Sequence, residues 1–336
     1  TGGGDAPGLN AVIRAVVKRA GDLGHQVIGI RRGWNGLLDN VETVNLRYDD
    51  VGDIMDQAGT ILLTSRTNPL KSPGGIGKIL ENMTKLNLDC LIAVGGDDTL
   101  SVAKKLVEMG VSVIGVPKTI DNDVPGTDFT FGFLTAVEDA ADALDNLRTT
   151  GASHERIMVA EIMGRNAGWI AAYSGIAAGA DLILVPEKPF RIPEVIDFIK
   201  KKKAGGKASL LIVVAEGALI MDYAGAITRD VKRDQFGNVM LGGIGEFLAK
   251  EIEEQTGYET RAVIPGHIIR GRKPIAFDRV LATRFGLLAA ELAHQRRFGR
   301  MVVLRGTRIA DIEIVEGLAG TRPLDHELIG FMEQTF

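Results

Sequence analysis

The chain has 336 residues, of which 45% are hydrophobic and 24% charged, and its formal net charge at pH 7 is −4. This composition is typical of a globular protein with room for two domains. The small net charge argues against nucleic-acid binding as the main function, and the sequence contains no apolar run of membrane-spanning length and no visible signal peptide. The single cysteine, Cys90, excludes a disulfide within the chain and fits a reducing, cytoplasmic compartment.

The N-terminal half alternates predicted strands and helices. It begins at a glycine-rich loop of the kind that normally follows a strand, so we expect that a first strand is missing from the sequence. In order, we expect a loop at 2–8, a helix at 10–19, strands at 26–30 and 60–66, a helix at 75–86, a strand at 91–94, a helix at 101–109, a strand at 111–116 and a helix at 130–148.

The C-terminal half continues the same alternation, which predicts a parallel α/β architecture. One α/β block closes and a second begins near Gly132. In order, we expect a strand at 156–163, a helix of small residues at 167–179, a strand at 181–185, a helix at 193–203, strands at 209–215 and 261–264 separated by a helix at 244–256, a helix at 278–296 and a strand at 301–304.

Polar clusters follow two of these strands directly. Residues 95–99 read Gly-Gly-Asp-Asp-Thr, and residues 117–123 read Pro-Lys-Thr-Ile-Asp-Asn-Asp. Ligands of open α/β sheets bind beyond the carboxyl ends of the strands, so both clusters are expected at one crevice. Either cluster alone also fits ordinary turn chemistry. Together they supply what phosphate chemistry needs: carboxylates for Mg²⁺ or for a proton, and a lysine for phosphate charge.

These motifs, taken with three others in the same order, resemble those of the 6-phosphofructokinase family. The others are the glycine loop at 2–8, Met-Gly-Arg at 163–165 and Pro-Gly-His-Ile-Ile-Arg at 265–270. The likeness covers essentially the whole chain. It implies two doubly wound α/β domains with the active site in the cleft between them. The first is expected at 1–132 plus about 269–318 and would hold donor and magnesium, and the second at 133–268 plus about 319–336 and would hold the sugar phosphate.

The resemblance also implies roles for individual residues. Asp121 matches the general base that takes the proton of the sugar 1-hydroxyl, and Asp97 matches the Mg²⁺ ligand. The remaining matches are Gly4 at the phosphoryl donor; Thr119, Arg66 and Arg165 at the transferred group; Ile120, Met163, Gly164, Glu216 and Arg270 at the sugar; and His267, Arg156 and Arg261 at its 6-phosphate. In the family Arg156 and Arg261 would come from a neighbouring subunit, which implies a homodimer or homotetramer with shared sites. From its position alone, Arg66 fits a phosphate ligand and a surface residue equally well.

Two positions bear on the phosphoryl donor. Members that use ATP typically have glycine where this chain has Asp98, and many have glycine where it has Lys118. An aspartate would crowd and repel the α-phosphate of ATP, whereas a lysine suits compact pyrophosphate. The pair resembles the pyrophosphate-dependent branch, whose reaction is reversible between fructose 6-phosphate and fructose 1,6-bisphosphate and belongs to glycolysis and gluconeogenesis.

Three other readings compete with this one. An ATP-dependent phosphofructokinase differs only in the donor. A non-catalytic regulatory subunit of the same family would tend to lose the base or the magnesium ligand, yet Asp97 and Asp121 are both present. A dinucleotide-binding oxidoreductase is disfavoured because the first loop lacks the fingerprint spacing of that class.

Overall fold

The computed structural model describes residues 1–221 and 242–335, and the chain divides into two compact units. Unit 1 comprises Thr1–Ile120, Val124–Thr135 and Arg270–Thr321, and unit 2 comprises Asp121–Asp123, Ala136–Ile269 and Arg322–Phe336. The functional division of the chain into a donor part and a sugar part stays a prediction. No helix in the described ranges combines the length and the apolar character needed to cross a bilayer.

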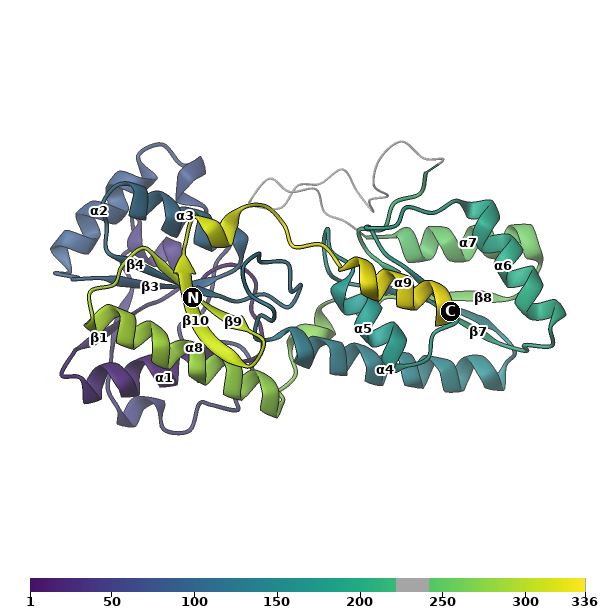
Figure 1. The fold of residues 1–336 in the computed structure, drawn as a ribbon, viewed down its shortest axis with the longest axis horizontal. Coiled ribbons are helices and arrows are strands. Elements are labelled where there is room, and N and C mark those ends of the chain that lie inside the picture. The colour runs from purple at the N-terminus through teal and green to yellow at the C-terminus, as the bar shows by residue number, and fades with distance from the viewer. Residues whose placement is uncertain (222–241, 336) are drawn as a thin grey trace. The chain divides into compact units, whose positions relative to one another are not determined.

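Unit 1 is built around a four-stranded sheet in the order β10-β9-β4-β3. β3 (Leu91–Gly95), β4 (Val113–Pro117) and β9 (Arg300–Arg305) are parallel, and β10 (Arg308–Glu313) is antiparallel to β9. Helices α2 (Gly75–Lys85) and α3 (Asp97–Glu108) cover one face, and α1 (Leu9–Asp22) and α8 (Ala276–His294) cover the other (Figure 1). The strands β3 and β4 read as continuous apolar runs because both of their faces are covered in this way.

The remaining short elements lie in unit 1, except η4, which lies mostly in unit 2. β1 and β2 form a separate antiparallel pair, and five one-turn or slightly longer 3-10 helices occur in the described chain. Their bounds are Val27–Ile30 for β1, Thr43–Leu46 for β2, Gly33–Leu37 for η1, Asp49–Val51 for η2, Pro69–Lys71 for η3, Gly266–Arg270 for η4 and Glu316–Leu318 for η5.

Unit 2 contains a fully parallel sheet in the order β6-β7-β5-β8. Its strands are β5 (Ile157–Ile162), β6 (Leu182–Leu184), β7 (Leu210–Ala215) and β8 (Thr260–Val263). Its helices are α4 (Phe133–Ser153, whose first turn belongs to unit 1), α5 (Trp169–Ala177), α6 (Ile192–Ala204), α7 (Ile244–Thr256) and α9 (His326–Thr335).

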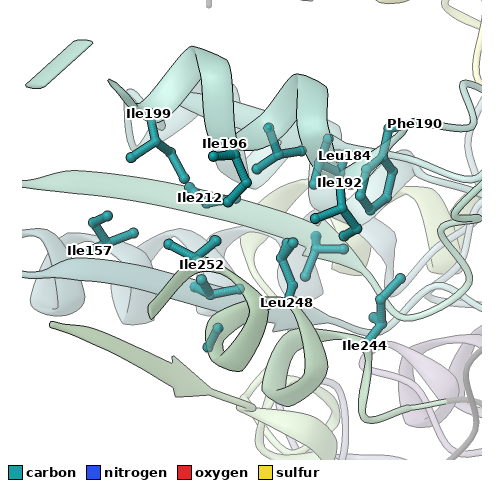
Figure 2. Close-up of a cluster of buried hydrophobic side chains, with 14 of the residues drawn as sticks. Ile157, Leu184, Phe190, Ile192, Ile196, Ile199, Ile212, Ile244, Leu248 and Ile252 are labelled. Carbon is teal, nitrogen blue, oxygen red and sulfur yellow. The ribbon is translucent and has the colours of Figure 1, made fainter. Parts of the chain in front are cut away.

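The core on one side of this sheet explains why α6 and α7 are helical (Figure 2). Ile192, Ile196 and Ile199 recur on one side of α6 at spacings of four and three residues, and α7 repeats the pattern with its own apolar residues. Both apolar stripes pack on the side chains of β5 and β7 that point to this face of the sheet, among them Ile157 and Ile212. On the opposite face of the sheet, glycines allow α4 and α5 to approach the strands closely. Gly175 of α5, for example, lies against Ile183 of β6.

The predicted α/β class with parallel sheets is therefore confirmed, while several element predictions are wrong. Residues 60–66 form no strand: Leu63 has a φ of 54°, and the Ile61 amide bonds to the Asn10 side chain rather than to a neighbouring strand. Helix α3 begins at Asp97, four residues before the predicted start, because Gly96 serves as its N-cap. The sequence reading also missed β2, β10 and α9.

Candidate active site

The first group of candidate residues lies at the carboxyl ends of β3 and β4 in unit 1. Gly95 and Pro117 are register partners at the end of the parallel ladder, and the Lys118 amide continues it by donating to the Gly95 carbonyl at 2.9 Å. The two polar clusters that follow these strands therefore start side by side. Asp98 follows the end of β3 and Lys118 follows the end of β4, so the backbone positions of both residues lie near this edge of the sheet.

The glycine loop packs against the same edge. The Gly2 amide donates to the Val94 carbonyl of β3 at 2.9 Å, and the Gly3 amide donates to the Ser65 carbonyl at 3.0 Å. A Cβ atom at Gly2 would lie 2.7 Å from Oγ1 of Thr99, and Gly3 has a φ of 80°. Only glycine meets both demands, so the loop owes its path to close backbone approach and to left-handed backbone.

Two cationic side chains reach this loop. Lys118 is 3% exposed and donates from Nζ to the Gly4 carbonyl. The guanidinium of Arg270 donates to the Asp5 carbonyl at 3.0 Å, and a Cβ atom at Gly4 would lie 3.0 Å from its Nη1. Arg66 follows Ser65, whose carbonyl holds Gly3. The loop is thus a backbone cradle with positive charge beside it, which suits an anionic phosphate group.

Asp97 and Asp98 occupy the first turn of α3, where carboxylates are stabilised by the helix dipole. Asp97 is exposed and Asp98 is half-buried, while Thr99 beneath them is buried. Among the described residues no group of three or more His, Cys, Asp or Glu side chains converges on one point. This donor set fits Mg²⁺, which commonly binds one or two carboxylates and takes its other ligands from water and substrate phosphates.

The second group of candidates lies in unit 2. Asp121 is 6% exposed, and Asn122, which is 1% exposed, has a φ of 53°. Asparagine tolerates this left-handed conformation better than most residues do, so the turn can bury Asp121 without requiring a glycine. Thr119 and Ile120, which precede Asp121 in the chain, are buried, and the Thr119 carbonyl accepts from Oγ1 of Thr130 at 2.8 Å within unit 1.

Glu216 lies at the carboxyl end of β7 and binds the turn that follows β5. Its Oε1 accepts from the amides of Gly164 at 3.2 Å and Arg165 at 2.9 Å. Burial raises the pKa of the Glu216 carboxyl, the two amide bonds oppose that rise, and the negative charges of Asp121 and Glu161 add to it. The predicted Met-Gly-Arg motif, Glu216 and Asp121 therefore share one electrostatic environment in unit 2.

The predicted 6-phosphate residues separate into two places. His267 is exposed in η4, after the carboxyl end of β8, on the same edge as Met163 and Arg165. Arg156 and Arg261 lie at the opposite edge, at the amino ends of β5 and β8. Both guanidinium groups pair there with Glu259, at 2.7 and 2.6 Å.

Because β5 separates Arg156 from Arg165, the two ends of that strand are roughly 20 Å apart at about 3.3 Å per residue. The structure does not bring Arg156 and Arg261 to the other candidates of unit 2.

Three further acidic or basic residues support the site, and the sequence reading missed them. Buried Glu161, the last residue but one of β5, accepts from the amides of Gly243 and Gly245 at the start of α7. The sequence did contain a signal for Glu161, because it is a charged residue inside an otherwise apolar predicted strand. Glu187 and Arg322 gave no signal, because their contacts join segments far apart in the sequence.

The chain is similar to known proteins over most of its length. The phosphofructokinase family matches residues 1–293. The chain is 51% identical over 328 residues to a protein of Amycolatopsis methanolica named pyrophosphate--fructose 6-phosphate 1-phosphotransferase, covering 97% of this chain and 95% of that one. It is 48% identical over 317 residues to ATP-dependent 6-phosphofructokinase 3 of Streptomyces coelicolor, covering 94% and 91%.

A solved structure shows the same fold. Phosphofructokinase from Saccharomyces cerevisiae superposes with a TM-score of 0.80 at 29% identity. The match covers 94% of this chain and 44% of the yeast chain, so this chain spans less than half the length of that relative. The family match and the relatives at about half identity lead to one conclusion: the chain belongs to the phosphofructokinase family.

Proposed function

We propose that this chain transfers a phosphoryl group from pyrophosphate to the 1-hydroxyl of fructose 6-phosphate, giving fructose 1,6-bisphosphate and phosphate in a reversible, Mg²⁺-dependent reaction. The observation that carries the proposal is the placement of Lys118, whose ammonium group sits on the glycine loop in the unit that also holds Asp98. The name of the relative that is 51% identical supports the same donor.

The residues of unit 1 serve the donor. The backbone around Gly4 meets the phosphates, and Lys118 and Arg66 balance their charge. Asp97 would hold Mg²⁺, which when bound neutralises charge on the transferring phosphates. Asp98 favours pyrophosphate, because a carboxylate about 4 Å from the α-phosphate of ATP would repel it by about 4 kcal/mol at an effective dielectric constant near 20.

The residues of unit 2 serve the sugar. Asp121 accepts the proton of the 1-hydroxyl, which makes that oxygen a better nucleophile. Arg165 offers positive charge to the transferring group, whose transition state carries charge on its equatorial oxygens. Met163, Gly164 and Glu216 contact the sugar, and Glu216 also fixes the turn through the Gly164 and Arg165 amides. His267 of unit 2, together with Thr119, Ile120 and Arg270, which belong to unit 1, completes the proposed sugar-phosphate contacts.

Arg156 and Arg261 serve the site of a neighbouring subunit in this proposal. They lie together on Glu259, at the edge of the sheet opposite to Arg165, so neither reaches the candidates of its own unit 2. A homodimer or homotetramer with shared sites would place them on the partner's 6-phosphate. The proposed setting is sugar-phosphate metabolism in the cytoplasm, in glycolysis or gluconeogenesis.

An ATP-dependent phosphofructokinase is the second candidate, favoured by the relative that is 48% identical and carries that name. One assay separates the two. Formation of fructose 1,6-bisphosphate is followed with pyrophosphate or ATP at saturating fructose 6-phosphate and Mg²⁺, and the reverse reaction is followed with inorganic phosphate. Pyrophosphate should give the higher kcat/KM, and phosphate should support the reverse reaction. A chain that turns over ATP more efficiently would contradict the donor assignment.

A further inference from the structure

The segment that leads into α9 binds the loop that carries the proposed base. We call residues 322–324 the C-terminal strap. The Arg322 amide donates to the Asp123 carbonyl at 2.8 Å, two residues after Asp121. The Arg322 carbonyl in turn accepts from Nε1 of Trp169 at 3.1 Å. All of these residues belong to unit 2, so the strap connects the 121–123 loop to the start of α5.

The Arg322 side chain strengthens this attachment. Its guanidinium carbon lies 4.3 Å from the centroid of the Trp169 ring, which is the geometry of a cation–π contact. Trp169 is 1% exposed, so the ring is a fixed platform at the first residue of α5. Arg322 is therefore held by its amide, its carbonyl and its side chain at once.

The strap also reaches the turn that contains Arg165. Glu187 accepts from the Leu324 amide at 2.8 Å and from the Gly168 amide at 2.9 and 3.1 Å. Gly168 is the N-cap of α5 and closes the segment that begins with Met163. Glu216 holds the Gly164 and Arg165 end of the same segment. One carboxylate thus fixes each end of the 163–168 segment, and the strap shares one of the two.

Both catalytic segments contain backbone that needs such support. Asn122 and Arg165 have φ values of 53°, in the left-handed region that non-glycine residues seldom occupy. A conformation of this kind persists when the surrounding contacts determine it. The strap supplies those contacts directly beside Asn122, at Asp123, and through Glu187 beyond Arg165.

We propose that the C-terminal strap is a positioning element for the reaction, in which Arg322 and Glu187 are positioning residues that hold Asp121 and Arg165 in their reactive placement. This inference rests on the proposed roles of Asp121 and Arg165. It predicts that loosening the strap lowers the rate of the chemical step and leaves the binding of the donor largely unchanged, because the donor residues Gly4 and Lys118 belong to unit 1.

Two variants loosen the strap without touching Asp121 or Arg165. Arg322→Ala removes the side chain from Trp169, and Trp169→Phe removes the Nε1 donor while keeping an aromatic ring. Lys188→Ala is the matched control. It breaks the exposed ion pair between Lys188 and Glu333 of α9, on the same C-terminal segment, and keeps the Glu187 carboxylate with its Gly168 and Leu324 amide partners. Each is assayed as full-length protein with the donor that the unmodified chain uses.

We expect kcat to fall by about tenfold or more in both strap variants, since a displacement of about 1 Å can cost on the order of 10²-fold. The KM for the donor should stay within about twofold, because the donor residues Gly4 and Lys118 belong to unit 1 and the strap belongs to unit 2. Lys188→Ala should keep the kcat and the donor KM of the unmodified chain at a comparable melting temperature.

Three outcomes separate the possible failures. Strap variants with unchanged kcat overturn the inference, as does a kcat that falls only in proportion to the folded fraction measured by circular dichroism. If Arg322→Ala does not fold, Trp169→Phe decides by the same criteria. An active Asp121→Ser protein would instead overturn the proposed function, because Asp121 would not be the base. This result is distinct from the outcomes above, since it comes from a variant in which the strap is unchanged.

Discussion

A methyl group added at Gly95 probes the edge of the sheet where the proposed donor residues meet. The ideal Cβ of an alanine there would lie 2.4 Å from Cβ of Thr99 and 2.6 Å from its Cγ2 and Oγ1. Ordinary contact begins near 3.4 Å, so the end of β3 and the first turn of α3 must separate by about 1 Å. That turn carries Asp97 and Asp98, and the displacement therefore reaches the proposed magnesium ligand.

Gly95→Ala should cost stability and activity together. Overpacking of this size destabilises a core by about 1–3 kcal/mol. In a unit of this size each kcal/mol lowers the melting temperature by about 2–4 °C. A displacement of about 1 Å at the catalytic turn should lower kcat by about 10- to 100-fold. Thermal unfolding and steady-state kinetics at saturating substrates measure both effects.

Gly77→Ala is the matched control, because Gly77 lies in α2, is exposed, and has no atom within 4 Å of the added Cβ. Alanine there should stabilise the helix by about 0.5–1 kcal/mol and leave the kinetics unchanged. The reasoning would be refuted by a Gly95→Ala protein that melts within about 1 °C of the unmodified chain and retains kcat within about twofold.

Three further predictions concern unit 2. Asp121→Ser should lower kcat by about 10²–10⁴ with little change in the KM for sugar phosphate, and turnover within about threefold of the unmodified chain would remove Asp121 from the role of base. Mixing Arg156→Ala and Asp121→Ser chains under conditions that exchange subunits should restore activity above that of either parent, whereas a fully active monomer in sedimentation would contradict shared sites. Burial raises the pKa of Glu216 in the folded chain, so folding favours the protonated carboxyl. The resulting contribution to stability is complete below the ordinary pKa of about 4.3 and is lost as the pH rises through the folded pKa. The melting temperature of Glu216→Gln, relative to the unmodified chain, should therefore rise from about pH 4 to about pH 7, and a constant difference would contradict the raised pKa.

Much of the fold follows from local patterns in the sequence. The bounds of α7 agree with the prediction at both ends, because its apolar residues recur every four residues and Gly257 ends the helix with a φ of 74°. The strands that carry Gly95 and Pro117 were also predicted, since strands buried on both faces read as unbroken apolar runs.

The prediction failed where long-range contacts outweigh local pattern. Leu62 belongs to a small core with α1, so the apolar residues near it indicate burial rather than a strand, and the Ile61 amide finds its partner on the Asn10 side chain. β10 was missed because it pairs with β9 while keeping charged residues at both ends, Arg308 and Glu313. Polar edge strands of this kind lack the apolar run on which the prediction depends.

The candidate site divides in the same way. Lys118 and Glu216 could be proposed as site residues from motifs at strand ends, because their chemistry and their position are both visible in the sequence. The strap residues Arg322 and Glu187 could not be found, since their role depends on backbone amides that belong to distant segments. The separation of Arg156 from Arg165 required the strand register, which the sequence alone does not provide.

The central claim is that pyrophosphate is the phosphoryl donor, and the ratio of kcat/KM for pyrophosphate to kcat/KM for ATP tests it most directly. The ratio is measured at saturating fructose 6-phosphate and Mg²⁺ for the unmodified chain, for Asp98→Gly and for the double variant with Lys118→Gly. We expect a ratio well above one for the unmodified chain, a lower ratio for Asp98→Gly as the space for the α-phosphate opens, and a further fall when Lys118 is also replaced. A ratio below one in the unmodified chain would contradict the claim.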